Sequence, residues 1–342
     1  VCRVCLVDVG DKRLAASCVR AAADGMTVTT SSPKIEGLRK GLVELLLSDY
    51  PEAAGDDTRK TERDELRDLA AEYGADPERF PAGNGRPIDG SSKVIRVDHQ
   101  ACILCDRCIR ACDDVQVNNV IGRTGKGYST RIGFDLDDPM GASTCVSCGE
   151  CEKACPTGAL TIASLWQGAA DTVAGATTDL KAVDSVCPYC GVGCAITYYV
   201  DEFENRVVYA DGRPSPVNHE RLCVKGRYGF DYAAHPQRLT KPLIRRESAY
   251  PKGPLSAETT SLNGRRRKPG GLVDYEEVLP HFREATWEEA LELAGRRLRE
   301  INEEHGPAAM AGFGSAKCSN EEAYLFQKLI RAGFGTNNVD HC

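Results

Sequence analysis

The chain has 342 residues, 42% of them hydrophobic, which is enough for roughly two or three domains with cores of their own. Its formal net charge is -7, with both signs mixed along the chain, so the composition argues against nucleic-acid binding and suits a cytoplasmic enzyme subunit. No run of about eighteen apolar residues could cross a bilayer, and Val1 to Leu6 look like the interior of a motif. We therefore expect no membrane segment, no signal peptide and a missing start.

Cysteine is the most informative residue type, with 17 Cys against 3 Met. Only Cys318 and Cys342 stand apart from four groups. The groups are Cys2, Cys5 and Cys18; Cys102, Cys105, Cys108 and Cys112; Cys145, Cys148, Cys151 and Cys155; and Cys187, Cys190, Cys194 and Cys223. Disulfide frameworks belong to short secreted chains, and bridges between thiols so close in sequence are strained, so the spacing favours metal binding.

The first group, in residues 1–48, has one cysteine fewer than a two-iron cluster needs. The segment resembles the plant-type two-iron ferredoxin domain of complex I large subunits and NAD-linked formate dehydrogenases. In that family the first ligand lies about ten residues upstream, which here falls before Val1. The resemblance implies a partial β-grasp domain that holds a 2Fe-2S cluster through Cys2, Cys5 and Cys18. Either the chain is truncated or this cluster cannot be completed.

A helix is predicted to start at Ser32-Pro33, because proline fits the first helical position. One face of this helix carries a predicted core stripe of Ile35, Leu38, Leu42, Leu45 and Leu46. Residues 49–92 follow as a charged connector, with a helix expected from Thr61 to Tyr73. The resembling family usually has a histidine and three cysteines here for another four-iron cluster. Because Ser48 to Asp57 contains neither residue type, we expect a solvated connector whose cluster is lost.

The second and third groups are copies of one motif, CxxCxxCxxxC, with the second copy 43 residues after the first. Three thiolates on a tight loop can hold three irons of a cubane, while the fourth, on the following helix, points at the other cluster. We therefore assign one 4Fe-4S cluster to Cys102, Cys105, Cys108 and Cys155, and another to Cys145, Cys148, Cys151 and Cys112. Zinc sites usually pair two CxxC hooks across a longer gap, so zinc is the weaker alternative.

This duplication resembles a bacterial two-cluster ferredoxin module and spans residues 93–163, with Asp113 in the place of the usual proline. His99 precedes a complete cysteine set, so we expect it to be a loop residue rather than a ligand. A module of about seventy residues has little apolar core, so the clusters should hold its loops together.

The fourth group follows a linker of residues 164–182, and its last cysteine lies 29 positions after Cys194. Between these cysteines, Ala195 to Val200 and Arg206 to Ala210 alternate in polarity and predict strands of a small sheet. Gly191 and Gly193 allow the first loop to fold tightly around a cofactor. On spacing alone, a four-cysteine zinc site competes with a 4Fe-4S cluster here.

Residues 183–240 look like the N-terminal cluster domain of molybdopterin oxidoreductases, which the motifs Cys187 to Cys194 and Cys223-Val-Lys-Gly-Arg227 carry. This resemblance implies a third 4Fe-4S cluster, on Cys187, Cys190, Cys194 and Cys223. It also implies that Lys225 lies between cluster and pterin and relays electrons. Without the resemblance, the alternative for Lys225 is an ordinary surface lysine.

Residues 241–285 are polar, rich in proline and glycine, and include the basic run Arg265 to Lys268. We expect a linker or surface insertion, with the basic run in a solvated loop. In residues 286–342, the pattern predicts a helix from Trp287 to Ile301, a strand from Ala308 to Phe313, and a helix from Asn320 to Ala332. This order is the start of an α/β layer.

The segments Gly314 to Tyr324 and Gly335 to Cys342 look like the opening of the pterin-binding domain of formate dehydrogenase catalytic subunits. The resemblance implies pterin contacts from Ser315, Lys317, Asn320, Asn338 and Asp340. It puts the metal-ligating cysteine or selenocysteine just after the residue that matches Cys342, so Cys342 is not predicted to bind the metal. Cys318 is expected to be a small buried residue near the pterin.

The predicted fold is therefore an α+β multidomain chain. It comprises the partial β-grasp domain, the duplicated 4Fe-4S module, a small 4Fe-4S β domain and the start of an α/β pterin-binding domain. The resemblance implies the front of a formate dehydrogenase, with molybdenum or tungsten bis-molybdopterin guanine dinucleotide in the full-length protein. Electrons from formate would leave one at a time through the clusters to a flavin/NAD-binding or other electron-acceptor subunit.

Three alternative classes share parts of this pattern. A complex I large subunit normally keeps the histidine-bearing cluster segment and lacks the duplicated module. A hydrogenase electron-transfer subunit lacks a pterin domain, so Cys223 to Arg227 argues against it. Another molybdopterin oxidoreductase stays open, because substrate choice depends on residues downstream. If Cys187 to Cys223 bound zinc, the chain would be only a ferredoxin with an additional structural domain.

Overall fold

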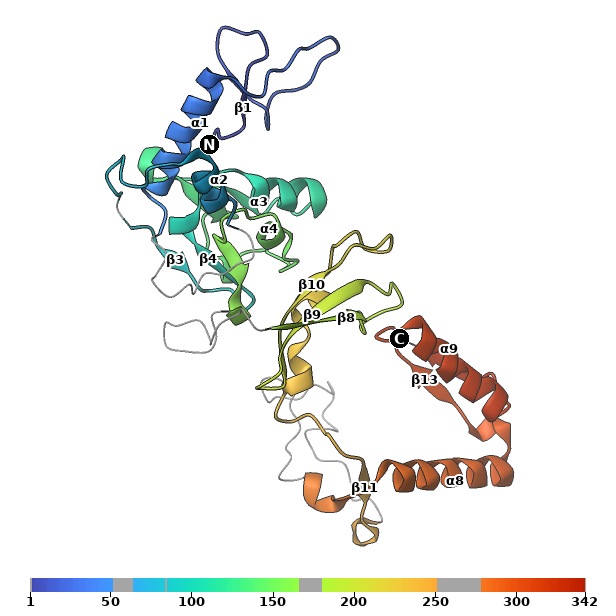
Figure 1. Ribbon diagram of the computed structural model, residues 1–342. Coiled ribbons are helices and arrows are strands. Elements are labelled where there is room, and N and C mark those ends of the chain that lie inside the picture. Colours follow the sequence, from blue (N-terminus) through green and yellow to red (C-terminus); the bar gives the residue numbers. More distant parts are fainter. Residues whose placement is uncertain (1, 52–63, 84, 166–179, 251–277, 342) are drawn as a thin grey trace. The chain divides into compact units, whose positions relative to one another are not determined.

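The chain is a mixed α+β protein in a computed structural model that describes residues 2–51, 64–83, 85–165, 180–250 and 278–341 (Figure 1). It divides into two units, Val1–Ala233 and Ala234–Cys342. The α+β class predicted from the sequence is confirmed. The basic run at residues 265–268 lies outside the described residues.

Short elements dominate the first unit, as expected for loops that hold cofactors. Its helices are α1 (Pro33–Leu47), α2 (Glu65–Tyr73), α3 (Arg107–Arg110), α4 (Glu150–Lys153) and α5 (Val224–Tyr228). Its strands are β1 (Leu6–Val7), β2 (Ala15–Ala16), β3 (Ile88–Asp89), β4 (Ile95–Asp98), β5 (Ile121–Thr124), β6 (Arg131–Phe134), β7 (Leu160–Ile162), β8 (Lys181–Val186), β9 (Ala195–Asp201) and β10 (Arg206–Gly212).

Helix α1 starts where the sequence predicts, because the Ser32 hydroxyl caps it by accepting a hydrogen bond from the Ile35 amide at 3.3 Å. The predicted core stripe is wrong in part. Leu38 and Leu45 are about half exposed, whereas Val43 and Glu44 are buried. The helix packs against α2, and this contact turns the face of Val43 inward; the buried Glu44 carboxylate accepts a hydrogen bond from the Asp76 amide at 3.2 Å.

The connector is packed against the ferredoxin module rather than simply solvated. Helix α2 begins later than predicted, because the Asp64 carboxylate caps it by accepting a hydrogen bond from the Arg67 amide at 3.1 Å. Residues 61–63 lie outside the described residues. The Tyr50 hydroxyl lies within hydrogen-bond distance of the Asp64 carboxylate, at 2.9 Å, and of the Thr157 carbonyl, at 2.8 Å, and shares its proton between them. Strand β3 pairs with β4, so the sheet of the module begins before the predicted boundary at residue 93.

The ferredoxin module has two antiparallel pieces, the sheet β3-β4-β7 and the hairpin β5-β6. Their apolar side chains form one core that includes four cysteines. Its buried members are Ile95, Val97, Ala101, Cys108, Cys112, Val120, Ile121, Ile132, Phe134, Met140, Cys151, Cys155, Ala159 and Leu160. Because thiols are part of this core, metal binding and folding share the same contacts.

The hairpin side of this core offers a matched pair of stability tests. Phe134 is 2% exposed and Leu136, two residues later, is 95% exposed. We expect Phe134→Ala to lower the free energy of unfolding by about 3–5 kcal/mol, because it leaves a cavity. Leu136→Ala should change it by less than about 0.5 kcal/mol. Urea denaturation midpoints of the two variants at equal iron content check this, and equal midpoints would contradict the assigned core.

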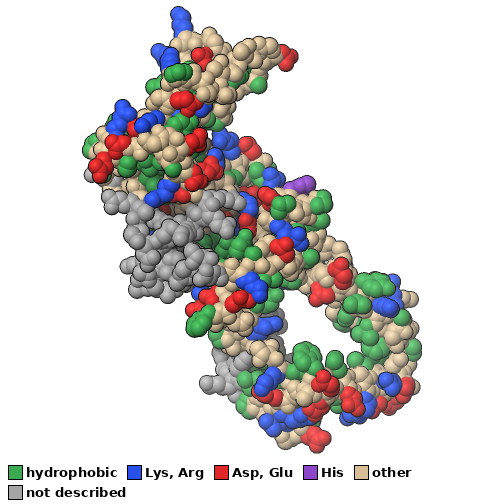
Figure 2. Space-filling view, viewed as in Figure 1, with side chains coloured by type: hydrophobic (Ala, Val, Ile, Leu, Met, Phe, Trp, Pro, Cys, Tyr) green, Lys and Arg blue, Asp and Glu red, His purple; other side chains and the backbone are tan. Residues whose placement is uncertain are grey.

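The cluster domain that follows is an antiparallel sheet in the order β10-β9-β8, and both predicted strands are confirmed. Strand β8 adds a third, which starts at Lys181 inside the predicted linker. Ile196, Ala210 and Leu222 form the small buried core. Figure 2 shows Lys or Arg and Asp or Glu side chains interspersed over the visible face, without a block of one sign.

In the second unit, the two ends of the predicted linker form a pair of strands, whereas the sequence predicted no strand there. Its elements are β11 (Leu243–Arg245), β12 (Phe282–Glu284), α8 (Trp287–His305), β13 (Gly312–Gly314), α9 (Asn320–Lys328) and β14 (Val339–His341). Strands β11 and β12 are antiparallel, and β13 and β14 are parallel. The helix predicted to end at Ile301 extends to His305, and that predicted to end at Ala332 turns π-helical after Lys328.

The predicted strand from Ala308 is wrong in its first half. A 3₁₀ turn occupies Pro307–Ala309, and β13 begins only at Gly312. A Cβ at Gly312 would collide with the Ile330 side chain, so glycine lets the end of helix α9 pack on this strand. The apolar side chains Trp287 and Leu291 of α8 are largely exposed. None of the helices in the described ranges combines the length and apolar composition needed to cross a bilayer.

Candidate iron–sulfur sites

The two CxxCxxC loops have the same unusual backbone. Leu104 and Asp106 have positive φ angles of 55° and 64° in the first copy, and Ser147 and Gly149 have 54° and 82° at the same spacing in the second. Positive φ in a non-glycine residue costs about 1–3 kcal/mol and persists only where the surroundings require it. Three strained positions in two ligand loops therefore indicate that the loop shape is built to direct thiols inward.

Backbone amides in these loops point at sulfur atoms. The Ser147 amide donates to Cys145 Sγ at 3.4 Å. The backbone amides of Leu104, Arg107 and Glu150 oppose the rise that burial causes in the pKa of Cys102, Cys105 and Cys148, in each case from two residues further along the chain. Such N–H donors stabilise negative charge on thiolate ligands and help to set the potential of a bound cluster.

The fold brings the fourth cysteine of each motif to the loop of the other copy. The charge of Cys155 raises the pKa of Cys102, Cys105 and Cys108, so its sulfur lies near theirs. Cys112 is a neighbour of Cys145 and Cys148. It lies in a π-helical turn, Ala111–Val115, that continues α3. This grouping supports the crossed ligand assignment, which stays a prediction.

Burial keeps several of these thiols protonated in the absence of a cluster. It raises the pKa of Cys102 to about 11, and it also raises the pKa of Cys108 and Cys151 well above the usual value of a thiol. Neighbouring thiols add to the effect. Metal binding must therefore displace protons from these sulfurs, as expected of metal sites that form together with the fold.

In the described residues, no three His, Cys, Asp or Glu side chains meet closely enough to hold a single metal ion. Four thiols per set are nevertheless the donors that iron–sulfur clusters use, and each cysteine of a cubane binds a different iron. The donor chemistry of the sets thus fits a cluster.

The fourth set is formed by two segments of the sheet domain. The Cys187 amide donates to the Cys194 carbonyl at 2.9 Å and closes the first loop, in which Gly193 has a φ of 67°. Cys223, at the start of α5, is an electrostatic neighbour of Cys187 and Cys194. Cys187 is buried, whereas Cys190 and Cys223 are exposed.

Lys225 lies on the exposed side of α5, between Cys223 and the buried Arg227. Its backbone carbonyl accepts a hydrogen bond from the Gly229 amide at 2.8 Å. The relay role predicted for its side chain is not tested by this geometry and stays a prediction.

The N-terminal cysteines meet beside the first ferredoxin loop. Pairing of β1 with β2, and a hydrogen bond from the Ser17 amide to the Cys5 carbonyl at 3.1 Å, bring Cys5 and Cys18 together. Burial raises the pKa of Cys105, and the thiols of Cys155 and Cys2 add to this effect. Cys2 is therefore close to the Cys102 set.

The predicted pterin contacts lie in the second unit. Parallel pairing places Asp340 opposite Phe313, so Asp340 and the segment after Gly314 share one end of the strand pair. Ser315, Lys317, Asn320 and Asp340 are exposed. The side-chain amide of Asn338 donates through Nδ2 to the Met310 carbonyl at 3.1 Å and so supports the strand. Cys318 was expected to be buried and is only half-buried, with its thiol donating to the Ser315 carbonyl at 3.0 Å. Cys342 lies outside the described residues.

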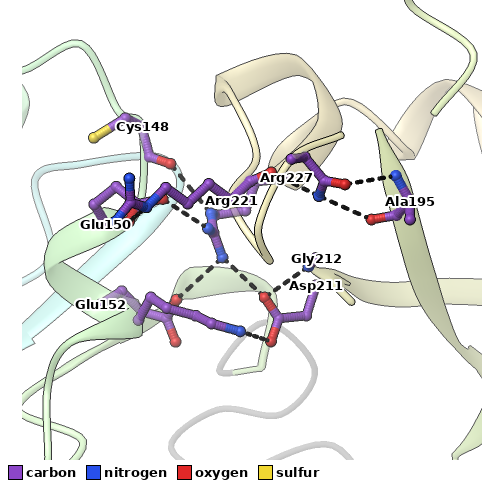
Figure 3. A network of polar contacts seen from close by, with 10 residues as sticks. Cys148, Glu150, Glu152, Ala195, Asp211, Gly212, Arg221 and Arg227 are labelled. Atoms are coloured by element: carbon purple, nitrogen blue, oxygen red, sulfur yellow. Dashed lines mark hydrogen bonds and ion pairs between the residues drawn. The ribbon is translucent and has the colours of Figure 1, made fainter. Parts of the chain in front are cut away.

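Sequence reasoning missed a buried ionic network beside the Cys145 set, which centres on Arg227 and includes Glu150, Glu152 and Asp211 (Figure 3). The only sequence signal was the position of Arg227 in the Cys223 motif, which does not reveal its burial. His99, by contrast, was expected in a loop and is buried at the start of a 3₁₀ turn, His99–Ala101. Burial lowers its pKa.

Comparison with known families matches these sites in chain order. Residues 101–159 match the 4Fe-4S dicluster domain, residues 180–235 the molybdopterin oxidoreductase Fe4S4 domain, and residues 238–342 the molybdopterin oxidoreductase family. The chain belongs to the molybdopterin oxidoreductase family. The dicluster match lies in the first unit, the Fe4S4 match lies there except for its last two residues, and the molybdopterin match lies in the second unit.

Relatives of this molybdopterin oxidoreductase chain are longer proteins with different names. It is 33% identical to an NADH-quinone oxidoreductase subunit of Rhizobium meliloti and 31% identical to the NADPH-Fe(3+) oxidoreductase subunit alpha of Geobacter sulfurreducens, over 99% of the chain and 35% of each relative. It is 29% identical to a putative formate dehydrogenase of Staphylococcus aureus, over 100% of the chain and 34% of that protein. The chain thus spans about a third of the length of these relatives.

Proposed function

We propose that the chain is the iron–sulfur portion of a cytoplasmic formate dehydrogenase, with a molybdenum or tungsten bis-molybdopterin guanine dinucleotide in the full-length protein. The observation that carries the proposal is the presence of three four-cysteine sets followed directly by the start of a molybdopterin domain. The Staphylococcus aureus relative supports formate as the substrate. When bound, the clusters supply one-electron carriers, which suit the stepwise release of two electrons.

The thiol sets lie in a spatial series that supports this role. Cys108 and Cys151, from different ferredoxin sets, are electrostatic neighbours. Tyr228 of α5 packs against the ferredoxin core, beside Cys151 and Cys148. With Cys2 close to Cys105, the series runs from the Cys187 set through the Cys145 set and the Cys102 set to the N-terminal cysteines. These neighbour relations support a series of four candidate redox sites along the first unit.

The N-terminal cysteines are proposed to hold the 2Fe-2S cluster of a partial β-grasp domain, with Cys2, Cys5 and Cys18 as ligands. Because these cysteines lie at one end of the series, we propose that electrons pass from their cluster to an acceptor subunit. The names of the Rhizobium meliloti and Geobacter sulfurreducens relatives refer to NADH and NADPH, so a flavin/NAD-binding subunit is the proposed partner.

Lys225 is proposed to lie between the Cys187 set and the pterin and to relay electrons between them. Pterin contacts are proposed for Ser315, Lys317, Asn320, Asn338 and Asp340. In the full-length protein, Lys225→Met should slow formate-dependent reduction of the clusters by about 10–100-fold, as for other residues next to metal ligands. Lys181→Met changes an exposed lysine of the same domain and serves as the control. Stopped-flow absorbance at the cluster bands, with dithionite to report total reducible iron, measures both variants.

A second candidate function is electron transfer from NADPH or NADH rather than from formate. It has support from the names of two relatives, which are 31% and 33% identical to the chain. If NADPH or NADH reduces the clusters of the full-length protein and formate does not, the proposal of formate oxidation is wrong and the family assignment stands. If formate reduces them and the Lys225→Met variant behaves like the Lys181→Met variant, formate stands and the relay role of Lys225 fails.

A further inference from the structure

Arg227 is a buried cation whose donors all point into the ferredoxin module or the adjoining sheet. Its side chain is 1% exposed. Nε donates to the Cys148 carbonyl at 3.1 Å, Nη1 to Asp211 at 3.2 Å and Nη2 to Glu150 at 3.4 Å, while Glu152 lies 3.8 Å from Nη1. A guanidinium offers such a fork of fixed donors, which lysine cannot reproduce.

These contacts join two cluster domains. Cys148, Glu150 and Glu152 belong to the second ferredoxin ligand loop and α4. Arg227 follows Cys223 on α5, and Asp211 is the last residue but one of strand β10. Figure 3 shows Cys148 directing its carbonyl at Arg227 and its sulfur away from it. One side chain therefore contacts the ligand loop of the Cys145 set and lies four residues from a ligand of the Cys187 set.

The network is balanced in charge, which is why it can be buried. Lys153 pairs with Asp211 at 2.6 Å, and Arg221 approaches Glu150 at 3.9 Å. Three cations, Arg227, Lys153 and Arg221, thus face the three carboxylates of Glu150, Glu152 and Asp211. Arg221 is 59% exposed and reaches only the edge, so the buried connection depends on Arg227.

The internal duplication provides a comparison within the molecule. Asp106 and Gly149 occupy equivalent places in the two ligand loops, both with positive φ. The first copy tolerates a side chain there, and Asp106 pairs with Arg123. In the second copy, a Cβ at Gly149 would collide with Arg227 and with the Tyr228 hydroxyl. Glycine at this position therefore fits the close approach of α5 rather than the needs of the loop alone.

The helices after the two loops have opposite charge. Arg107 of α3 makes two hydrogen bonds of 2.7 Å to Glu65 of α2. Its equivalent in α4 is Glu150, which pairs with Arg227. The equivalent positions of the two copies thus contact different helices, α2 in the first copy and α5 in the second. The residue at this position is basic in the first copy and acidic in the second.

We propose that Arg227 is a positioning residue that fixes the separation and orientation of the Cys145 and Cys187 cluster sites and thereby sets the rate of electron transfer between them. The proposal rests on the proposed function, because it requires clusters at both sets. Tunnelling rates fall exponentially with distance, so a small displacement of α5 has a large effect on the rate without loss of either cluster.

The test uses the chain with its clusters assembled under anaerobic conditions. Arg227→Met removes the fork, and Arg227→Lys keeps the charge without it. Gly149→Ala keeps every charge and displaces α5 by steric contact. We expect all three to retain iron and sulfide, to lose the magnetic interaction between the two reduced clusters in electron paramagnetic resonance spectra, and to slow intramolecular transfer after flash reduction by about tenfold or more.

Two controls match these changes. Arg221→Met removes an exposed arginine that reaches only Glu150, and Gly74→Ala adds a Cβ at another positive φ, where nothing lies within 4 Å. Both control variants should retain the magnetic interaction between the reduced clusters and the wild-type rate of intramolecular electron transfer. Unchanged coupling and rate in the three test variants at full iron content would overturn the proposal, as would coupling that is lost only in proportion to lost iron. Absence of iron from the wild-type chain would instead refute the proposed function.

Discussion

Removing iron from the anaerobically purified chain is expected to unfold the ferredoxin module and leave helix α8 intact. Four cysteines are buried members of the module's core, so the clusters replace apolar volume that this short segment lacks. The ligand loops also have left-handed residues, Leu104, Asp106 and Ser147, whose strain is compensated only when the thiols are bound. Metal binding energy therefore becomes folding energy, and a chelator should reverse it.

Hydrogen exchange measured before and after chelation under argon checks this result. Protection of amides in β4, β5, β6 and β7 should fall by about 10³-fold or more, which corresponds to about 4 kcal/mol. Helix α8 contains no cysteine and belongs to the other unit, so its protection should not change and serves as the internal control. Equal protection with and without iron would show that the apolar core suffices alone. Zinc in place of iron and sulfide in the purified chain would remove the electron-transfer account altogether.

Iron counting in double variants is expected to reveal crossed ligand sets. Cys112→Ala should lose the same cluster as Cys148→Ala, because Cys112 is a neighbour of the Cys145 loop in space although it belongs to the first motif in sequence. The double variant of Cys112 and Cys148 should then lose about four irons, since both ligands serve one cubane. The double variant of Cys112 and Cys105 should lose about eight.

The converse pair completes this experiment. Cys155→Ala combined with Cys105→Ala should lose about four irons, because Cys155 lies beside the Cys102 loop. Cys318→Ala is the control, since this cysteine belongs to none of the sets and its thiol bonds to the Ser315 carbonyl. Iron and acid-labile sulfide per chain are the measured quantities. If the double variant of Cys112 and Cys105 loses only about four irons, the ligand sets are not crossed.

Much of the site could be predicted because its signals are local. The two copies of the cysteine motif need no tertiary structure to be recognised, and Ser32 caps helix α1 by a hydrogen bond three residues away. Strands β9 and β10 follow from their alternation in polarity. Local spacing was less reliable for α1, where Ile35 of the predicted apolar stripe is buried but Leu38 and Leu45 are about half exposed.

The sequence by itself determined which cysteines are candidate cluster ligands, where α1, α8, α9, β9 and β10 begin, and the family that the chain resembles, because cysteine spacing, capping and alternation in polarity depend on neighbours a few residues apart. Only the tertiary structure decided which helix face packs inward. It alone revealed that Arg227 bonds to Cys148, 79 positions earlier. Contacts over such separations depend on how whole elements pack, and a single arginine in the sequence is compatible with burial or exposure until its carboxylate partners are placed around it.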